Sequence, residues 1–136
     1  MMPVLLDSDF SGANLSGARL NNANLCGANF SKANLSGAAL RSAYIQKTCL
    51  QGANLSGANL QHANLSDSNL SDADLNKADL SDAWLVSVQL VRAKLTNVDA
   101  KRTNMRDADL REAGLHSVDF SGAILDGADF GGARIG

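Results

Sequence analysis

The chain has 136 residues, of which 45% are apolar and only 4% aromatic, and its 12 basic and 14 acidic residues give a net charge of −2. This length fits one domain over residues 1–136, and a nearly neutral chain lacks the basic surface of a protein that binds nucleic acid directly. Because no run of 18 apolar residues occurs, the sequence also predicts no membrane-spanning helix.

The first residues, Met1 to Leu6, are apolar but carry no basic segment before Asp7, so they do not resemble a secretory signal peptide. We therefore expect a cytoplasmic protein. Pro3 has no backbone N–H and suits the edge of a β-structure. Residues 1–9 are accordingly predicted to form a weak N-terminal cap within the first coil of the repeat that follows.

A five-residue repeat occupies the chain. From Leu5 to Ile135 every fifth position is apolar, with 19 Leu, 4 Phe, 2 Ile, Met105 and Ala100, and the residue two places earlier is Ala in 19 of 27 units. At about 100° per residue, a period of five would spread these side chains around a helix, which excludes a helical interpretation. In an extended segment, residues two apart point to the same side. Each unit is therefore predicted to be a short strand-like stretch with one buried side.

The two remaining residues of each unit are turn formers, such as Ser11-Gly12 and Ser56-Gly57. Short extended stretches joined by bends that keep one side buried must coil around that side, and stacked coils pair their backbones. Because Ala is a poor strand former, its regular use indicates a narrow interior with room for one large and one small side chain per unit. The sequence predicts an all-β solenoid.

Residues 13–17 (Ala-Asn-Leu-Ser-Gly) and 73–77 (Ala-Asp-Leu-Asn-Lys) are typical units. The pattern resembles the pentapeptide repeat family, of the type found in cyanobacteria, whose motif is Ala-(Asp/Asn)-Leu-x-x. The resemblance covers essentially the whole chain. It implies a right-handed quadrilateral β-helix with four pentapeptides in each 20-residue coil and about seven coils.

With a 20-residue coil, residues 20 apart in the sequence share a column. One interior column has its phenylalanines toward the two ends, where their rings are expected to plug the tube: Phe10, Phe30 and Phe130. Ala100 is the one small residue at a large position and is expected to leave a gap. Val98, Val118 and Phe120 are interpreted as compensation for it.

Cys26 and Cys49 fall at outward positions more than ~7 Å apart, too far for a disulfide, and no Cys/His cluster suggests zinc. Ser42, His62 and Asp82 stack in successive coils and are the residue types of a hydrolase triad. On an outward corner, however, nothing excludes water and no donors converge on an oxyanion, so we interpret them as a solvated polar ladder. The sequence therefore predicts no enzyme, no cofactor, and no catalytic or metal-binding residue.

One outward column breaks the polar pattern, since it contains the only Tyr and the only Trp of the chain. Exposed aromatic residues on a regular rod are candidate anchors for a partner, although isolated outward apolar residues are also common. The candidate partner-binding patch consists of Tyr44, Trp84, Val86 and Ile124.

These observations favour a non-catalytic structural or protein-interaction rod with an unidentified protein partner. The alternative is a DNA-mimicking topoisomerase (gyrase) inhibitor or protector, a role known in the family, but the rod lacks the continuous acidic surface that mimicry of duplex DNA requires. The chain stops at Ile135-Gly136 without a C-terminal cap. This predicts either an end-to-end homodimer through the C-terminal coil or a truncated longer chain.

Overall fold

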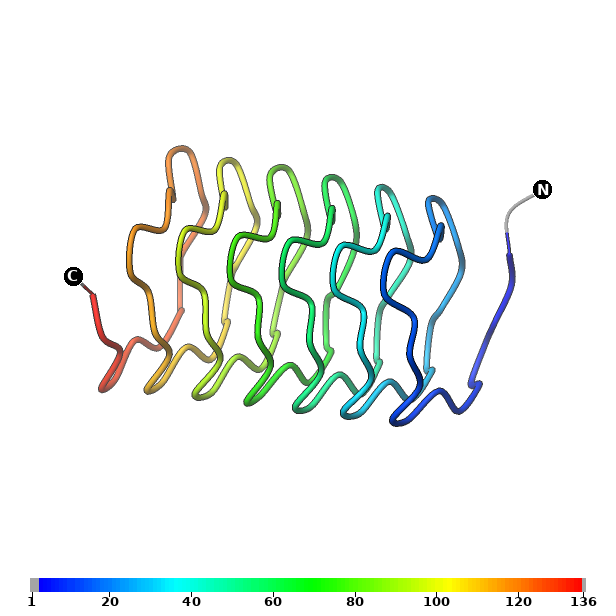
Figure 1. Cartoon of the computed structure of the whole chain (residues 1–136). Coiled ribbons are helices and arrows are strands. Elements are labelled where there is room, and N and C mark those ends of the chain that lie inside the picture. Colours follow the sequence, from blue (N-terminus) through cyan, green and yellow to red (C-terminus); the bar gives the residue numbers. More distant parts are fainter. Residues whose placement is uncertain (1–2, 136) are drawn as a thin grey trace.

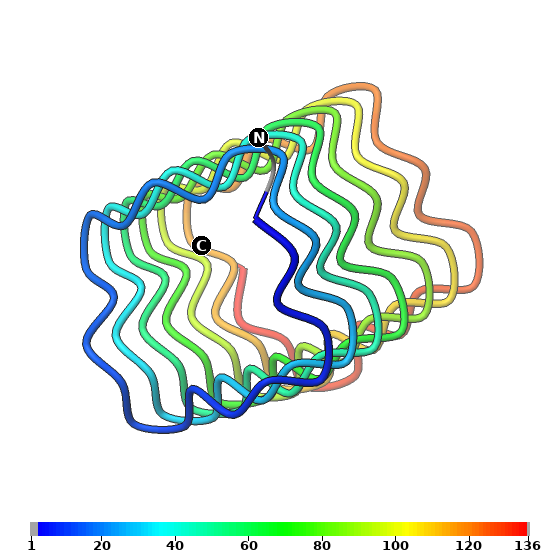
Figure 2. The same ribbon diagram turned by 90° about the vertical axis from the view of Figure 1, so that its right-hand side faces the viewer.

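A computed structural model describes residues 3–135. The backbone forms a stack of coils with the two termini at opposite ends of the stack (Figure 1), and a view from the end shows one coil behind the next (Figure 2). Every backbone bridge is parallel and joins a residue to the one 20 places later, from Val4 with Asn24 to Gly114 with Arg134. The chain is therefore an all-β solenoid, and the expected spacing of 20 residues is the spacing of its bridges.

The extended stretches are shorter than strands. Within residues 3–135 there is neither a helix nor a strand with two successive bridge residues, because single bridge residues alternate with two-residue turns. In residues 53–57, for example, the Asn54 N–H donates to Ala33 O at 2.9 Å and the Leu55 N–H donates to Asp74 O at 2.7 Å. One unit thus bonds to the coil before it and to the coil after it through two adjacent residues.

The turns lie where the turn-forming pairs predict them. The Ala58 N–H donates to Leu55 O at 3.0 Å and closes a β-turn, whose third residue, Gly57, has a φ of 66°. Type II β-turns have a positive φ at this position. Lys77 adopts the same conformation with a φ of 63°, so the stacked coils impose it on residues that favour it less than Gly, Asn or Asp.

The Asn or Asp at the bridge position stabilises the turn that follows. In the same unit, the Ser56 N–H donates to Asn54 Oδ1 at 3.0 Å, and this N–H has no backbone partner among residues 3–135. Units with Asp at this position behave alike, since the Asn76 N–H donates to Asp74 Oδ1 at 2.9 Å. The motif therefore places a short acceptor side chain where the turn has a free donor.

The interior is filled by the Leu and Ala columns, whose members in the central coils are at most 3% exposed. Their side chains leave a cavity of only about 10 Å³, lined entirely by apolar residues between Leu25 and Leu65, which is at the lower limit for one water molecule. Toward the ends, Phe10 stacks on Phe30 at 5.2 Å and Phe120 meets Phe130 edge to face at 6.3 Å between ring centroids. The phenylalanines thus lie near the open ends, as expected.

Two interior hydroxyls occupy the small position that Ala usually fills. Thr48 Oγ1 donates to Ser68 Oγ at 3.0 Å, and Ser68 Oγ donates to Ile45 O at 2.6 Å. Both side chains are buried, and their hydrogen bonds offset the loss of water. They join two successive coils through side chains inside the tube.

Ala100 tests how well the interior adapts to a missing large side chain. It is fully buried, and Val98, one of the residues proposed to compensate for it, is 1% exposed. We expect Ala100→Leu to raise the free energy of unfolding by at most about 1 kcal/mol, because neighbouring bulk already occupies much of the space. Urea unfolding measures this change, and a gain of several kcal/mol would show that the position borders an empty cavity.

Candidate functional site

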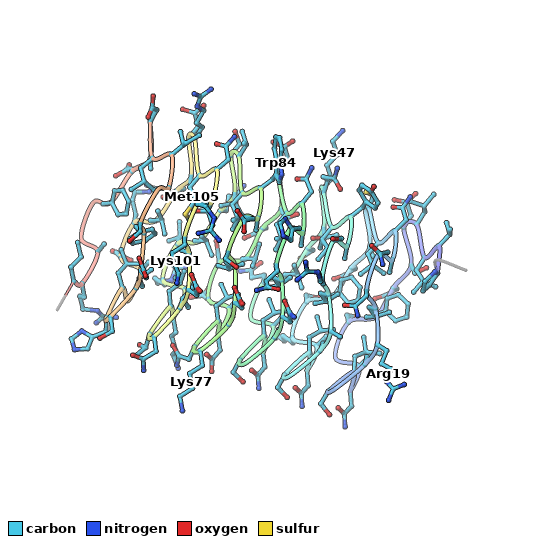
Figure 3. The ribbon with its side chains drawn as sticks, turned by 90° about the horizontal axis from the view of Figure 1, so that it is seen from above. Arg19, Lys47, Lys77, Trp84, Lys101 and Met105 are labelled. Atoms are coloured by element: carbon cyan, nitrogen blue, oxygen red, sulfur yellow. The ribbon has the colours of Figure 1, made fainter. Side chains whose placement is uncertain are left out.

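Three residues of the candidate patch, Tyr44, Trp84 and Ile124, lie on one continuous ladder of bridges. The residues of this central column alternate between apolar side chains and asparagine: Val4, Asn24, Tyr44, Asn64, Trp84, Asn104 and Ile124. Tyr44 is 48% exposed, Trp84 54% and Ile124 38%. Trp84 projects from the edge of the rod that also carries Lys47 (Figure 3). We call the outward surface of the units that contain these residues the Trp84 face. Its three columns are formed by the bridge residue and the two turn residues of each unit, such as Trp84, Val86 and Ser87.

The asparagines of this column fold back on their own turns. The Ser66 N–H donates to Asn64 Oδ1 at 3.0 Å, and the Arg106 N–H donates to Asn104 Oδ1 at 3.3 Å. Tyr and Trp offer no acceptor at the same point. Their bulk extends outward instead, so apolar side chains project from the Trp84 face at every second coil, about 9.6 Å apart.

Val86 differs from the other predicted patch residues, because it is half-buried. Its N–H donates to Ser66 Oγ at 3.2 Å and so finds in the neighbouring coil a substitute for the missing Asn acceptor. The structure therefore brings all four predicted residues onto one face but leaves Val86 as a supporting residue. It adds Val4 at 63% and Leu6 at 51% exposure, and the position of Val4, 40 residues before Tyr44, is the signal that could have included it.

Because Trp84 forfeits the hydrogen bond that Asn makes at this position, its replacement should cost little stability. We expect Trp84→Asn to unfold within about 1 kcal/mol of the wild type, since the regained turn bond offsets the lost contacts of a half-exposed ring. Thermal and urea unfolding followed by circular dichroism measure the difference. A loss of about 3 kcal/mol or more would mean that Trp84 is a structural residue and would remove it from the patch.

The Ser42, His62 and Asp82 ladder does not form a triad. His62 Nε2 lies 4.0 Å from Asp82 Oδ2, and within residues 3–135 no hydrogen bond joins the Ser42 and His62 side chains. Arg102 instead holds both carboxylate oxygens of Asp82, with donor distances of 2.8 and 3.0 Å. The close ion pair of this ladder is therefore that of Asp82 with Arg102, in keeping with the interpretation of the ladder as polar surface.

The Arg102 guanidinium lowers the pKa of Asp82 below its ordinary value of 3.8, chiefly through this hydrogen bond. A carboxyl whose pKa is lower in the folded state contributes stability that is complete above the unfolded pKa and is lost as the pH falls through the folded one. Without Arg102, the pKa of Asp82 should differ less between the folded and unfolded states. We therefore expect the free energy of unfolding to fall less in Arg102→Gln than in the wild type between about pH 5 and about pH 2. Urea titrations across this range test the prediction, and parallel curves would contradict it.

The part of the chain that the structure describes holds no cluster of three residues fit to bind a metal. Cys26 and Cys49 are free thiols, and the Cys26 thiol donates to Gln46 Oε1 at 3.2 Å. A surface hollow of about 400 Å³ lies beside Arg92, Arg111 and Glu112. Its arginines are already paired with Asp72 and Asp109, so this hollow presents no unpaired cation to a ligand.

Among the described residues, no helix is long and apolar enough to cross a membrane. A comparison with curated protein sequences gives no match. Several solved structures resemble the chain, among them the following two. The plasmid-mediated fluoroquinolone resistance protein QnrB1 matches at 19% identity and a TM-score of 0.69, over 98% of this chain and 79% of that one. HetL of Nostoc sp. strain PCC 7120, involved in heterocyst differentiation regulation, matches at 30% identity and a TM-score of 0.47, over 98% and 77%.

The repeat pattern is matched directly by a family model. The pentapeptide repeats model matches in eight copies over residues 8–46, 48–85, 89–127 and 113–135. These segments contain nearly all the bridges of the solenoid, so the sequence pattern and the backbone agree over the same residues. The chain belongs to the pentapeptide repeat family.

Proposed function

We propose that the chain is a non-catalytic protein-interaction rod and that the Trp84 face is its contact surface for protein. The observation that carries this proposal is the column of exposed apolar side chains, with Tyr44 48% and Trp84 54% exposed on an otherwise polar rod. Exposed aromatic residues are the usual anchors of protein interfaces. The filled interior supports a binding function over an enzymatic one, because it offers no space for a substrate.

Affinity capture from the native source tests this function. The bait is the full chain, compared with a Tyr44→Asn/Trp84→Asn double variant that keeps the turn bonds of the column. The matched control is Lys94→Asn, which replaces an exposed bridge-position residue on another face with the Asn found at position 54 of its own column. We expect the double variant alone to lose the captured protein. Retention by both variants would overturn the Trp84 face as the contact surface.

We further propose the finer geometry that the family resemblance implies: a right-handed quadrilateral β-helix of about seven coils, with residues 1–136 as one domain. The parallel bridges 20 residues apart and the turn in every unit support it. Residues 3–9 pair with the following coil, as when the Leu5 N–H donates to Asn24 O at 2.8 Å, which supports a weak cap over residues 1–9. The free thiols of Cys26 and Cys49 suit a cytoplasmic location.

The C-terminal coil supports the proposal of an end-to-end homodimer. Its last described residues border an apolar hollow of about 270 Å³, lined by Leu115, Val118, Phe120, Leu125, Phe130 and Ile135. Ile135 is 75% exposed. A charge in its lining, Phe130→Asp, should prevent such contact, and light scattering at high protein concentration would show whether the variant differs from the wild type.

The gyrase alternative has less support, and the likeness to QnrB1 at 19% identity concerns the fold alone. Duplex DNA carries about one negative charge per 1.7 Å, whereas Asp99 and Asp119 share Lys101 at 3.5 and 3.9 Å. Lys101 therefore offsets part of the negative charge of these two aspartates. We propose no direct binding to nucleic acid, and the gyrase role stays the alternative: inhibition of gyrase supercoiling by the purified chain would favour it over the interaction rod.

A further inference from the structure

The Trp84 face has a relief that repeats every second coil. Trp84 and Tyr44 project from it, while Asn64 and Asn104 lie folded on the turns beside them. Projections and shallow positions therefore alternate with a period of about 9.6 Å. A second copy of the same chain, running antiparallel, has the same period and can place each of its projections over a shallow position.

We propose that the Trp84 face docks on the Trp84 face of a second copy, antiparallel and related by a two-fold axis across the rods. This inference rests on the proposed protein-interaction function and names its partner. Trp84 packs over the partner's Asn64, and Tyr44 packs over the partner's Asn104. Such an interface is isologous, because each contact occurs twice.

The charges beside the central column select this register. The third column of the face runs from Asp7 through Lys47 and Asp67 to Asp107. In the proposed register Lys47 faces the partner's Asp107, and no like charges of this column oppose each other. A shift by one coil sets Asp67 against the partner's Asp67 in one direction and against its Asp107 in the other. In both cases the projecting apolar side chains of the two copies lie opposite one another instead of opposite asparagines. A shift by two coils either sets Asp7 against the partner's Asp107 or leaves Tyr44 uncovered.

Both charges of the proposed pair are available. Lys47 and Asp107 are exposed, and within residues 3–135 neither forms an ion pair. Lys47 stands one coil before Asp67, the spacing at which Arg92 and Asp72 pair at 2.9 Å. At this spacing Arg92 is held within the chain, whereas the structure gives Lys47 no such pair with Asp67 among residues 3–135.

The face is large enough for a dimer. The total exposed surface is 6381 Å², and each coil has four units, so one face presents about 1600 Å². A stable interface needs about 800 Å² from each partner. Covering about half of one face therefore suffices, and it would bury the Tyr44 and Trp84 rings.

Sedimentation equilibrium of the full chain tests the proposal. We expect the wild type to dimerise, and Lys47→Glu to weaken dimerisation about tenfold or more, because the partner's Asp107 then faces like charge at two symmetric places. Asp107→Lys should have a similar effect, and the Lys47→Glu/Asp107→Lys double variant should recover the wild-type constant. The matched control is Lys77→Glu, an exposed lysine with the same turn conformation on the opposite edge (Figure 3), which should dimerise normally.

A wild type that stays monomeric at about 100 μM, or a double variant no better than the single ones, would overturn the self-docking. Circular dichroism of each variant shows that it is folded. The proposed function has a separate readout: if the chain is monomeric but capture of another protein still requires Tyr44 and Trp84, the interaction rod stands and its partner is a different protein. If Phe130→Asp abolished dimerisation while Lys47→Glu dimerised like the wild type, the contact would lie at the end of the rod. That result would also overturn this proposal.

Discussion

Insertion of one residue between Asn54 and Leu55 is expected to remove most of the folding stability. Two side chains that point inward are separated by one that points outward, so a single added residue turns Leu55 away from the core unless the chain bulges there. A bulge displaces a Leu that is 1% exposed and breaks the Leu55 N–H bond to Asp74 O. We expect a loss of at least about 4 kcal/mol, against a total of about 5–15 kcal/mol for a typical domain.

Longer insertions at the same point should do less harm. Five added residues with the sequence Leu-Ser-Gly-Ala-Asn keep every large residue inside but shift the columns, which separates the Thr48 and Ser68 hydroxyls now 3.0 Å apart. A loss of about 1–2 kcal/mol is expected. A duplicate of a whole 20-residue coil restores all columns and should leave stability unchanged or raise it.

Urea unfolding followed by circular dichroism compares the three insertions with the wild type. The order of stability should be the full coil first, then the five-residue unit, and the single residue last. A single-residue variant as stable as the five-residue one would show that the turns absorb length freely. In that case the inward and outward code, rather than the stacking register, would be the weaker constraint on the fold.

The interior could be predicted from the sequence because its code is local. Leu55 and Ala53 point inward because they are two residues apart in an extended stretch, and the equivalent residues of the other units do so for the same reason. No partner elsewhere in the chain has to be known. The role of Asn54 could not be predicted in this way, since its bond to the Ser56 N–H follows from the turn geometry. The length of the extended stretches could not be predicted either. It depends on the backbone hydrogen bonds, which adjacent residues make to the preceding and the following coil in turn.

The candidate face was predicted once residues 20 apart were placed in one column, and the bridges from Tyr44 through Asn64 to Trp84 confirm that placement. The hydrogen bond of the Val86 N–H was not predictable, because its acceptor is the Ser66 hydroxyl in the preceding coil. Ion pairs are equally hidden in the sequence. Arg111 pairs with Asp109 of its own unit at 2.7 Å rather than with Asp129 at 4.0 Å, a choice among side-chain conformations that the column alone leaves open.

Ala73→Leu is expected to be among the most destabilising single substitutions in the chain. Ala73 is fully buried, and its column holds Ala in every coil from Ala13 to Ala133, whereas the other small columns admit Val, Thr or Ser. Its N–H donates to Leu70 O at 3.1 Å across the preceding turn, and its O accepts from the Lys94 N–H of the next coil at 2.9 Å. The backbone therefore cannot retreat from a larger side chain without breaking ladder bonds.

A cost of at least about 3 kcal/mol follows, because three added carbons must enter a close-packed interior. Ala100→Leu is the matched control, since the substitution and the burial are the same but Ala100 stands at a position built for a large residue. Urea unfolding of both variants should separate them by about 3 kcal/mol or more. Equal effects would mean that the tube widens to fit either side chain, and the regular use of Ala would then reflect the turns rather than the width of the interior.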